Sequence, residues 1–236
     1  MMQDRSQFLL KQSLLLALAL VILCSFFSIG GRLDLKLIAP FVDLTGHFPL
    51  KNHWALAQLN HRYVKNILIL VYLSFLLGWL ASFKFQAWQT RRWEFGYYFG
   101  MVVISTVLIG ILKSQSAHAC PWNMAIAGPQ GMSWNFSATA GHCFPGGHAS
   151  SGFALMAGYF IYRGSNQPRA YFLLFSASIL GLAMGWAQMM RGAHFFSHNL
   201  WTGWIIWCLN VIAYALFYHK LPQARRYSSV KSGNLT

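Results

Sequence analysis

Long apolar segments dominate this chain and restrict it to folds that cross a lipid bilayer. Six of them lie at residues 13–29, 66–83, 95–112, 148–162, 170–190 and 199–218. An α-helix needs roughly 20 apolar residues to cross the hydrocarbon core. Only 9% of the residues are charged, whereas a soluble domain carries about 25%. The sequence therefore predicts an all-α polytopic membrane protein, with six transmembrane helices in a bundle and residues 1–236 forming a single membrane domain.

The ends and the first connection complete this organisation. No convincing small-residue cleavage site follows residues 13–29, so we interpret them as an anchor helix rather than a removed signal peptide. Residues 31–65 are amphipathic, and we expect this connection to lie along the outer interface. Residues 219–236 form a short basic tail.

Basic residues set the expected orientation. The chain has 18 Lys and Arg against 4 acids, a formal charge of +14. Most of these cations flank the apolar segments instead of forming one soluble basic face, so they indicate topology and contact with anionic lipid, not nucleic acid. With both termini inside, 11 basic residues lie on the inner side and 7 on the outer side. The positive-inside rule then predicts a multi-pass protein with both termini on the cytoplasmic side. We expect the membrane to be a bacterial inner membrane, with the active site facing the periplasm.

Acidic residues are nearly absent, which limits the chemistry. The four acids are Asp4, Asp34, Asp43 and Glu94, and none follows Glu94. A site in the C-terminal part must therefore use His, Lys, Arg, Ser and backbone groups. Paired-carboxylate catalysis and an oxygen-rich cation site are close to excluded there. We expect neither a metal nor a cofactor.

Three polar groups interrupt the apolar pattern on the expected outer side. They are Lys113–Pro121 after the third apolar segment, Pro145–His148 at the start of the fourth, and Arg191–His198 between the fifth and the sixth. Gly146, Gly147 and His148 would lie at a helix N-terminus, where unpaired N–H groups and the helix dipole favour an anion. Ionisable residues at a helix mouth are costly and usually functional. The pattern predicts one phosphate-binding site.

Together the three groups resemble the motifs of the type 2 phosphatidic acid phosphatase superfamily. Its motifs are Lys-x6-Arg-Pro, Pro-Ser-Gly-His and Ser-Arg-x5-His-x3-Asp, and its membrane members are six-helix enzymes related to soluble acid phosphatases and vanadium haloperoxidases. The resemblance covers about residues 95–218, which it marks as the catalytic core. The matching positions are Lys113, Pro121, Pro145, Gly147, His148 and His194. The resemblance therefore implies a metal-independent phosphatase.

Four positions depart from the family pattern. Cys120 and Gln188 stand at the two arginine positions, Gly146 at the serine and His198 at the aspartate. Arg191 lies three residues after Gln188, hence on nearly the same face of a helix, and we expect it to supply a guanidinium. The role of the aspartate would pass to His198, to a backbone carbonyl, or to Asp34 or Asp43. An alternative register makes His198 the nucleophile.

The resemblance assigns a role to each matching residue. Lys113, Arg191 and the amides at Gly146 and Gly147 would hold the phosphate oxygens. His194 would attack phosphorus and form a phosphohistidine. His148 would protonate the leaving oxygen and then activate water.

Two cysteines fall in the same expected outer loop. Cys120 and Cys143 each lie beside one of the first two motifs. In an oxidising periplasm a disulfide between them would tie the segment of Lys113 to that of His148. The alternative is a zinc site formed by His118, Cys120, His142 and Cys143, although the spacing matches no strong zinc signature.

The predicted function is a membrane lipid phosphatase acting on a lipid phosphate or pyrophosphate. The resemblance allows lipid A, undecaprenyl pyrophosphate, phosphatidylglycerol phosphate or phosphatidate as substrate. A lipid phosphotransferase would use the same residues, with an acceptor lipid in place of water. A non-catalytic lipid-phosphate binding or transport protein is the other alternative, favoured by the lost arginine and aspartate positions.

Overall fold

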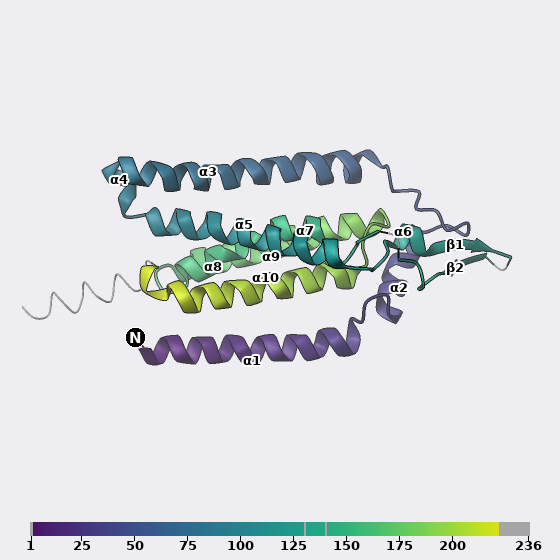
Figure 1. The fold of residues 1–236 in the computed structure, drawn as a ribbon, viewed down its shortest axis with the longest axis horizontal. Helices are drawn as coiled ribbons and strands as arrows, with labels where there is room; N and C mark the ends of the chain where they lie inside the picture. Colours follow the sequence, from purple (N-terminus) through teal and green to yellow (C-terminus); the bar gives the residue numbers. More distant parts are fainter. Residues whose placement is uncertain (1, 130, 140, 222–236) are drawn as a thin grey trace, which may run out of the picture.

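The computed structural model describes residues 2–129, 131–139 and 141–221 (Figure 1). The expected basic tail lies almost wholly outside these residues. The α-helices are α1 (Met2–Phe26), α2 (Arg32–Ile38), α3 (Lys65–Lys84), α4 (Gln86–Gln89), α5 (Arg92–Gln115), α6 (Pro121–Met124), α7 (Gly147–Phe153), α8 (Ala157–Tyr162), α9 (Gln167–Met190) and α10 (Phe196–Phe217). The structure also contains a β-hairpin, formed by β1 (Ala125–Gly128) and β2 (Gly131–Trp134).

Five helices in the described part of the chain are long and apolar enough to cross a membrane. They span Asp4–Phe26, Ala55–Lys84, Arg92–Gln115, Gln167–Met190 and Phe196–Lys220. They run side by side along the long axis of the molecule (Figure 1). Large apolar side chains such as Leu14, Leu70 and Ile179 are more than half exposed on their outer faces. A mostly helical fold with exposed apolar faces is what a membrane protein requires, because lipid replaces water around it.

The fourth expected crossing differs from the other five. Residues 147–162 fold as α7, a 3₁₀ turn η3 (Ala154–Met156) and α8, and this broken helix is too short to be counted among the five. It packs at the centre of the bundle against α9 and α10. A Cβ at Gly152 would lie 2.7 Å from the Cα of Gly181, so only glycine lets α7 and α9 approach this closely.

The connection between α1 and the second membrane-crossing helix is shorter than the sequence predicts. Its first part forms α2 and a 3₁₀ turn η1 (Ala39–Phe41), as an interfacial segment would. Its last part, however, is a π-helix η2 (Ala55–Val64) that runs directly into α3. The helix that begins the second crossing therefore starts at Ala55 and not near residue 66.

Indole hydrogen bonds attach α1 to the bundle. Trp207 Nε1 donates to Gln12 Oε1 at 2.9 Å, and Trp204 Nε1 donates to the Leu16 carbonyl at 3.0 Å. Both tryptophans belong to α10, which therefore lies between α1 and the central α7 and α9. In a lipid environment such bonds add specificity to apolar packing.

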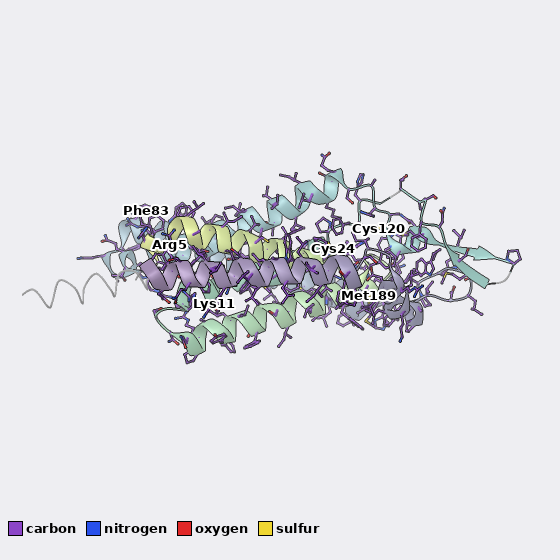
Figure 2. The ribbon with its side chains drawn as sticks, turned by 90° about the horizontal axis from the view of Figure 1, so that it is seen from below. Arg5, Lys11, Cys24, Phe83, Cys120 and Met189 are labelled. Atoms are coloured by element: carbon purple, nitrogen blue, oxygen red, sulfur yellow. A yellow bond between two sulfur atoms is a disulfide. The ribbon has the colours of Figure 1, made fainter. Side chains whose placement is uncertain are left out.

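The long loop between α5 and α7 folds at one end of the bundle. It contains α6 and the hairpin, which projects beyond the helices (Figure 1). The sequence gives no strong hairpin signal there, and the two strands are the one departure from the predicted all-α fold among the described residues. In Figure 2, Cys120 and Met189 mark this α6 end, whereas Arg5 and Phe83 mark the opposite, α4 end.

Candidate active site

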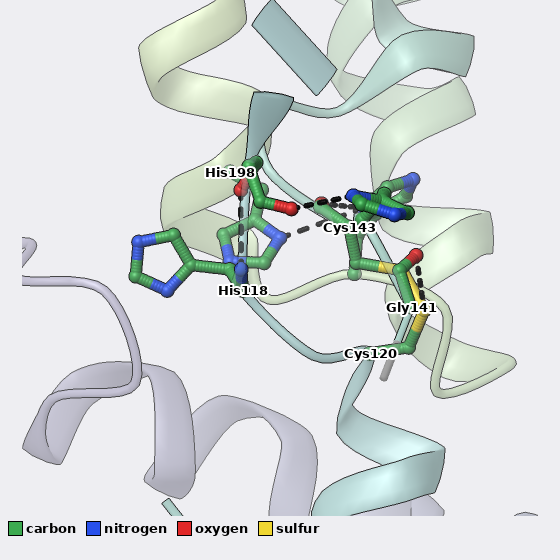
Figure 3. The surroundings of a disulfide bond; sticks show 8 residues. His118, Cys120, Gly141, Cys143 and His198 are labelled. Atoms are coloured by element: carbon green, nitrogen blue, oxygen red, sulfur yellow. Dashed lines mark hydrogen bonds between the residues drawn. A yellow bond between two sulfur atoms is a disulfide. The ribbon is translucent and has the colours of Figure 1, made fainter. Parts of the chain in front are cut away.

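The α6 end brings the three polar groups of the sequence together. The sulfurs of Cys120 and Cys143 are joined in a disulfide, with their Cα atoms 5.1 Å apart. This bond ties the start of the loop after α5 to the segment that enters α7. Figure 3 shows His118 and His198 beside this cross-linked loop. The same bond consumes the two thiolates that the alternative zinc site would need.

Lys113 reaches the start of α7. It lies in the last turn of α5, and its Nζ is 3.8 Å from the position that a Cβ on Gly147 would occupy. The ammonium group therefore lies against the first residue of the helix, where backbone N–H groups have no intrahelical partner. The structure thus places Lys113 and Gly147 together, an arrangement that the predicted phosphate site would need.

His194 is held in one orientation by the backbone. Its Nδ1 lies 2.6 Å from the carbonyl oxygen of Cys143, and its side chain is buried. A carbonyl oxygen only accepts hydrogen bonds, so Nδ1 carries the proton and Nε2 keeps its lone pair. This carbonyl does what an aspartate beside the nucleophile would do.

The surroundings of His194 also favour its neutral form. Burial lowers the pKa of His194 well below its ordinary value of 6.5, and the nearby His198 and Lys113 lower it further. A neutral imidazole is the form that can attack phosphorus. The electrostatics therefore suit a nucleophile at neutral pH.

His198 lies one helical turn after His194 at the start of α10. The two Nδ1 atoms are 3.5 Å apart, and the rings of His198 and His118 have their centroids 6.4 Å apart. The His198 carbonyl accepts a hydrogen bond from the Gly146 amide at 3.2 Å. His198 Nε2 is buried and has no hydrogen-bond partner among the residues that the structure describes. His198 therefore links the second motif to the third and retains one unsatisfied ring nitrogen.

A cavity of about 610 Å³ adjoins these histidines. Its wall includes both His118 and His198. Most of the remaining lining is apolar. Its large side chains come from the segment after α1, the end of α5, the loop after the hairpin, and the residues next to the second and third motifs. In that order they are Ile29, Leu112, Phe136, Phe144 and Phe195. The cavity thus combines an apolar wall with a histidine edge.

Within residues 2–129, 131–139 and 141–221, neither acid of the first connection forms a hydrogen bond with a histidine side chain of the site. Asp34 is buried and accepts hydrogen bonds from the Ser197 amide at 2.9 Å, from the Ser197 hydroxyl and from the Gly30 amide. Burial raises the pKa of Asp34 in spite of these bonds. Asp43 is exposed and bonds within its own loop to Thr45. Asp34 therefore caps α10 and fixes its first turn, rather than orienting an imidazole directly.

Arg191 lies beside Gln188, as their spacing predicts. Its Nη1 donates to Gln188 Oε1 at 3.1 Å, and its Nε donates to the Lys51 carbonyl at 2.8 Å. Burial lowers the pKa of this guanidinium. Gln188 Nε2 is buried and finds no hydrogen-bond partner in the described part of the chain. The structure places this pair at the end of α9, and within the described residues the hydrogen bonds of Arg191 go to Gln188 and Lys51 rather than to Lys113 or His194.

His148 occupies the second residue of α7 and is half-buried. Its position follows from the glycine pair before it, because the helix begins at Gly147. A Cβ at Gly146 would overlap Asn199 Oδ1. The buried Asn199 fills the space beside this glycine, and no signal in the sequence points to it, because it lies one residue beyond the third motif.

The comparisons with known proteins agree with this geometry. The PAP2 superfamily matches residues 94–222, which is more than half of the chain and includes all three motifs. No curated protein and no solved structure matches the chain. Members of the family are phosphatases, which supports a phosphoester hydrolase in general. The chain belongs to the PAP2 superfamily.

Proposed function

We propose that this protein is a metal-independent lipid phosphatase that works through a phosphohistidine. One observation carries the proposal, namely the buried His194 with its Nδ1 on the Cys143 carbonyl. Such an imidazole is neutral, fixed in one tautomer and close to the cation of Lys113. This is the arrangement that a nucleophile for an anionic phosphoryl group requires.

The proposed reaction has two steps. In the first, His194 Nε2 forms a bond to phosphorus while the bond from phosphorus to the leaving oxygen breaks, and His148 gives that oxygen a proton. In the second, His148 takes a proton from water, which attacks phosphorus and releases inorganic phosphate from His194. Lys113 and the amides at Gly146 and Gly147 stabilise the phosphoryl oxygens. Arg191 would join them if its guanidinium turns from Gln188 toward the ligand.

The apolar cavity supports a lipid as the leaving group. Ile29 follows the first crossing and Leu112 lies near the end of α5, so the cavity wall is continuous with the lipid-facing helices. A phosphate bound near Lys113 would leave its hydrocarbon chain on this side. We therefore place the substrate among lipid monophosphates and pyrophosphates.

The proposed setting is a bacterial inner membrane with the α6 end in the periplasm. The broken helix α7–η3–α8 would provide a sixth crossing inside the bundle. Among the described residues, seven basic side chains belong to segments of the α6 end and eight to segments of the opposite end, and the positive-inside rule expects an excess on the inner side for this orientation. A disulfide at the α6 end also suits an oxidising compartment.

Phosphate release by the purified protein in detergent tests the proposal. The panel comprises phosphatidate, phosphatidylglycerol phosphate, undecaprenyl pyrophosphate and lipid A, each with and without EDTA. We expect EDTA-resistant release from at least one lipid and none from the His194→Ala protein. Consumption of the donor lipid only when an acceptor lipid is added, with the phosphoryl group recovered on the acceptor and no inorganic phosphate released, would indicate a phosphotransferase. Binding of these lipids without turnover, whether or not an acceptor lipid is present, would contradict catalysis and support a binding or transport protein.

A further inference from the structure

A second apolar groove lies at the α4 end of the bundle, away from the candidate active site. It has a volume of about 470 Å³ and runs between α3, α5 and α10. Aromatic rings form much of its wall: Trp79, Phe83, Trp93, Tyr97 and Phe217. Phe83 and Phe217 are about half exposed, so the groove opens on the lipid-facing side of the helices. None of the three polar motifs reaches it.

Glycine keeps the groove open on the α5 side. Gly96 and Gly100 belong to its lining. A Cβ built on Gly100 would meet no atom within 4 Å. The absence of a side chain there is therefore not required by helix packing and leaves space for a ligand.

Two positively charged side chains, those of Arg92 and Lys220, lie at one end of the groove. Arg92 Nη2 donates to the Ser82 carbonyl at 2.6 Å, and its guanidinium lies 4.2 Å from the centre of the Phe83 ring. Lys220 Nζ lies 5.6 Å from the centre of the Trp93 ring. Arg92 is thus fixed in place by groups that do not neutralise it.

In the described part of the chain, no carboxylate forms an ion pair with Arg92 or Lys220. The nearest acid in the sequence, Glu94, forms an ion pair with Arg91 at 3.2 Å and accepts a hydrogen bond from Tyr162 at 2.9 Å. The end of the groove therefore carries a net positive charge beside an apolar wall. This combination is complementary to a molecule with an anionic head and a hydrocarbon chain.

We propose that this groove binds an anionic phospholipid, with an acyl chain between α3, α5 and α10 and its phosphate next to Arg92 and Lys220. The site is separate from the candidate active site and does not depend on the proposed function. Each basic residue near an anionic lipid strengthens binding roughly fivefold. Two such residues correspond to a preference of about 25-fold for an anionic over a zwitterionic headgroup.

Native mass spectrometry of the full-length protein tests the site. The protein is purified in detergent and titrated with dioleoyl phosphatidylglycerol or dioleoyl phosphatidylcholine, which differ only in the headgroup. The Gly100→Leu substitution fills the groove without a backbone clash. Gly110→Leu is its matched control, because Gly110 is on the same helix, outside the groove, and its Cβ would also meet nothing within 4 Å.

The proposal predicts one tightly retained phosphatidylglycerol and at least about tenfold weaker retention of phosphatidylcholine. Gly100→Leu should abolish this retention, Arg92→Gln should weaken it about fivefold, and Gly110→Leu and His194→Gln should leave it unchanged. Equal retention of the two lipids would overturn the proposal. Retention unchanged by Gly100→Leu would also overturn it, as would binding of either lipid only after removal of residues 222–236, which would identify the chain's own tail as the occupant.

Discussion

The two ends of the bundle differ in which groups contact their positively charged side chains. At the α4 end, two cations outside the groove, Arg91 and Arg163, have partners within the protein. Arg91 pairs with Glu94 at 3.2 Å, while Arg163 lies 3.5 Å from the centre of the Phe8 ring and donates to the Tyr214 hydroxyl at 2.6 Å. These contacts stabilise charge near the membrane boundary and hold helices together.

At the α6 end, Lys113 lies near the buried His194 and His198, and among the described residues no carboxylate pairs with any of the three. Moving the Lys113 ammonium partly out of water without a paired charge costs stability, and burial together with this positive charge keeps His194 neutral. A protein retains such a cost where function requires it. We infer from this difference that the Lys113 ammonium at the α6 end pairs with an anion of the bound ligand.

The largest expected effect is on turnover. His194→Gln keeps a polar side chain of similar size but removes the nucleophile, so phosphate release should fall at least about a thousandfold. The measurement is the initial rate with the best lipid of the panel. His53→Gln, an exposed histidine of the first connection, is the control and should retain full activity. If the His194→Gln protein kept its rate of phosphate release, His194 would not be the nucleophile, and the two ends would no longer differ in function.

Lys113→Gln should lower kcat about a hundredfold, because it removes a cation that stabilises the phosphoryl oxygens in the transition state. The exposed Lys36→Gln serves as a control for the loss of one positive charge. Similar losses in both variants would mean that Lys113 acts only through general electrostatics.

Loss of the disulfide should destabilise the α6 end selectively. Cys120→Ser with Cys143→Ser should lower the free energy of unfolding by about 2–4 kcal/mol, and a reductant should have the same effect on the unmodified protein. Thermal unfolding in detergent measures it, and Cys24→Ser is the control. Non-reducing mass spectrometry should yield a cross-linked peptide that contains both cysteines. Free thiols at both positions would contradict the pairing.

The α4 end should respond in stability rather than in catalysis. Arg163→Gln removes the contacts with Phe8 and Tyr214 and should cost about 1–2 kcal/mol, with kcat unchanged in the folded fraction. Arg32→Gln, which is exposed at the α6 end, should cost less than 0.5 kcal/mol, about what a surface substitution costs. A loss of kcat in the Arg163 variant would show that the two ends are coupled.

The smallest effect concerns pH. Because the pKa of His194 is lower in the folded state than its ordinary 6.5, the unfolded chain binds a proton first as the pH falls. Stability should therefore be unaffected by this group above about pH 6.5 and should decline below it, by at most about 1.4 kcal/mol per pH unit. His194→Gln should show a shallower decline in thermal unfolding at pH 5 than the unmodified protein. Identical pH profiles would show that His194 is not buried in its neutral form.

Much of the fold follows from hydrophobic length alone. The five long helices lie where the apolar segments predict them, because backbone groups in lipid must bond within their own helix. Two features escape this reasoning. The second crossing starts at Ala55 because the π-helix η2 forms in a polar stretch and continues into α3. The broken helix that begins at Gly147 is stabilised by burial within the bundle, which segment length alone does not indicate.

The candidate site was predictable where a motif is local and unpredictable where a partner is distant. Lys113 and Gly147 could be expected to meet from motif order. The contact of His194 with the Cys143 carbonyl could be stated only as one of several alternatives, because a backbone acceptor has no residue-type signal. The role of Asp34 as the cap of α10 was also hidden, since 163 residues separate it from Ser197.

The most direct test of the central claim is the capture of the phosphorylated enzyme. The protein is mixed with a lipid phosphate labelled with ³²P, quenched in alkali within the first turnover, and digested for peptide mapping. Our account predicts one acid-labile, alkali-stable label on His194 that is absent from the His194→Gln protein. A label on His198 would establish the alternative register, and turnover without any labelled histidine would contradict the phosphohistidine route.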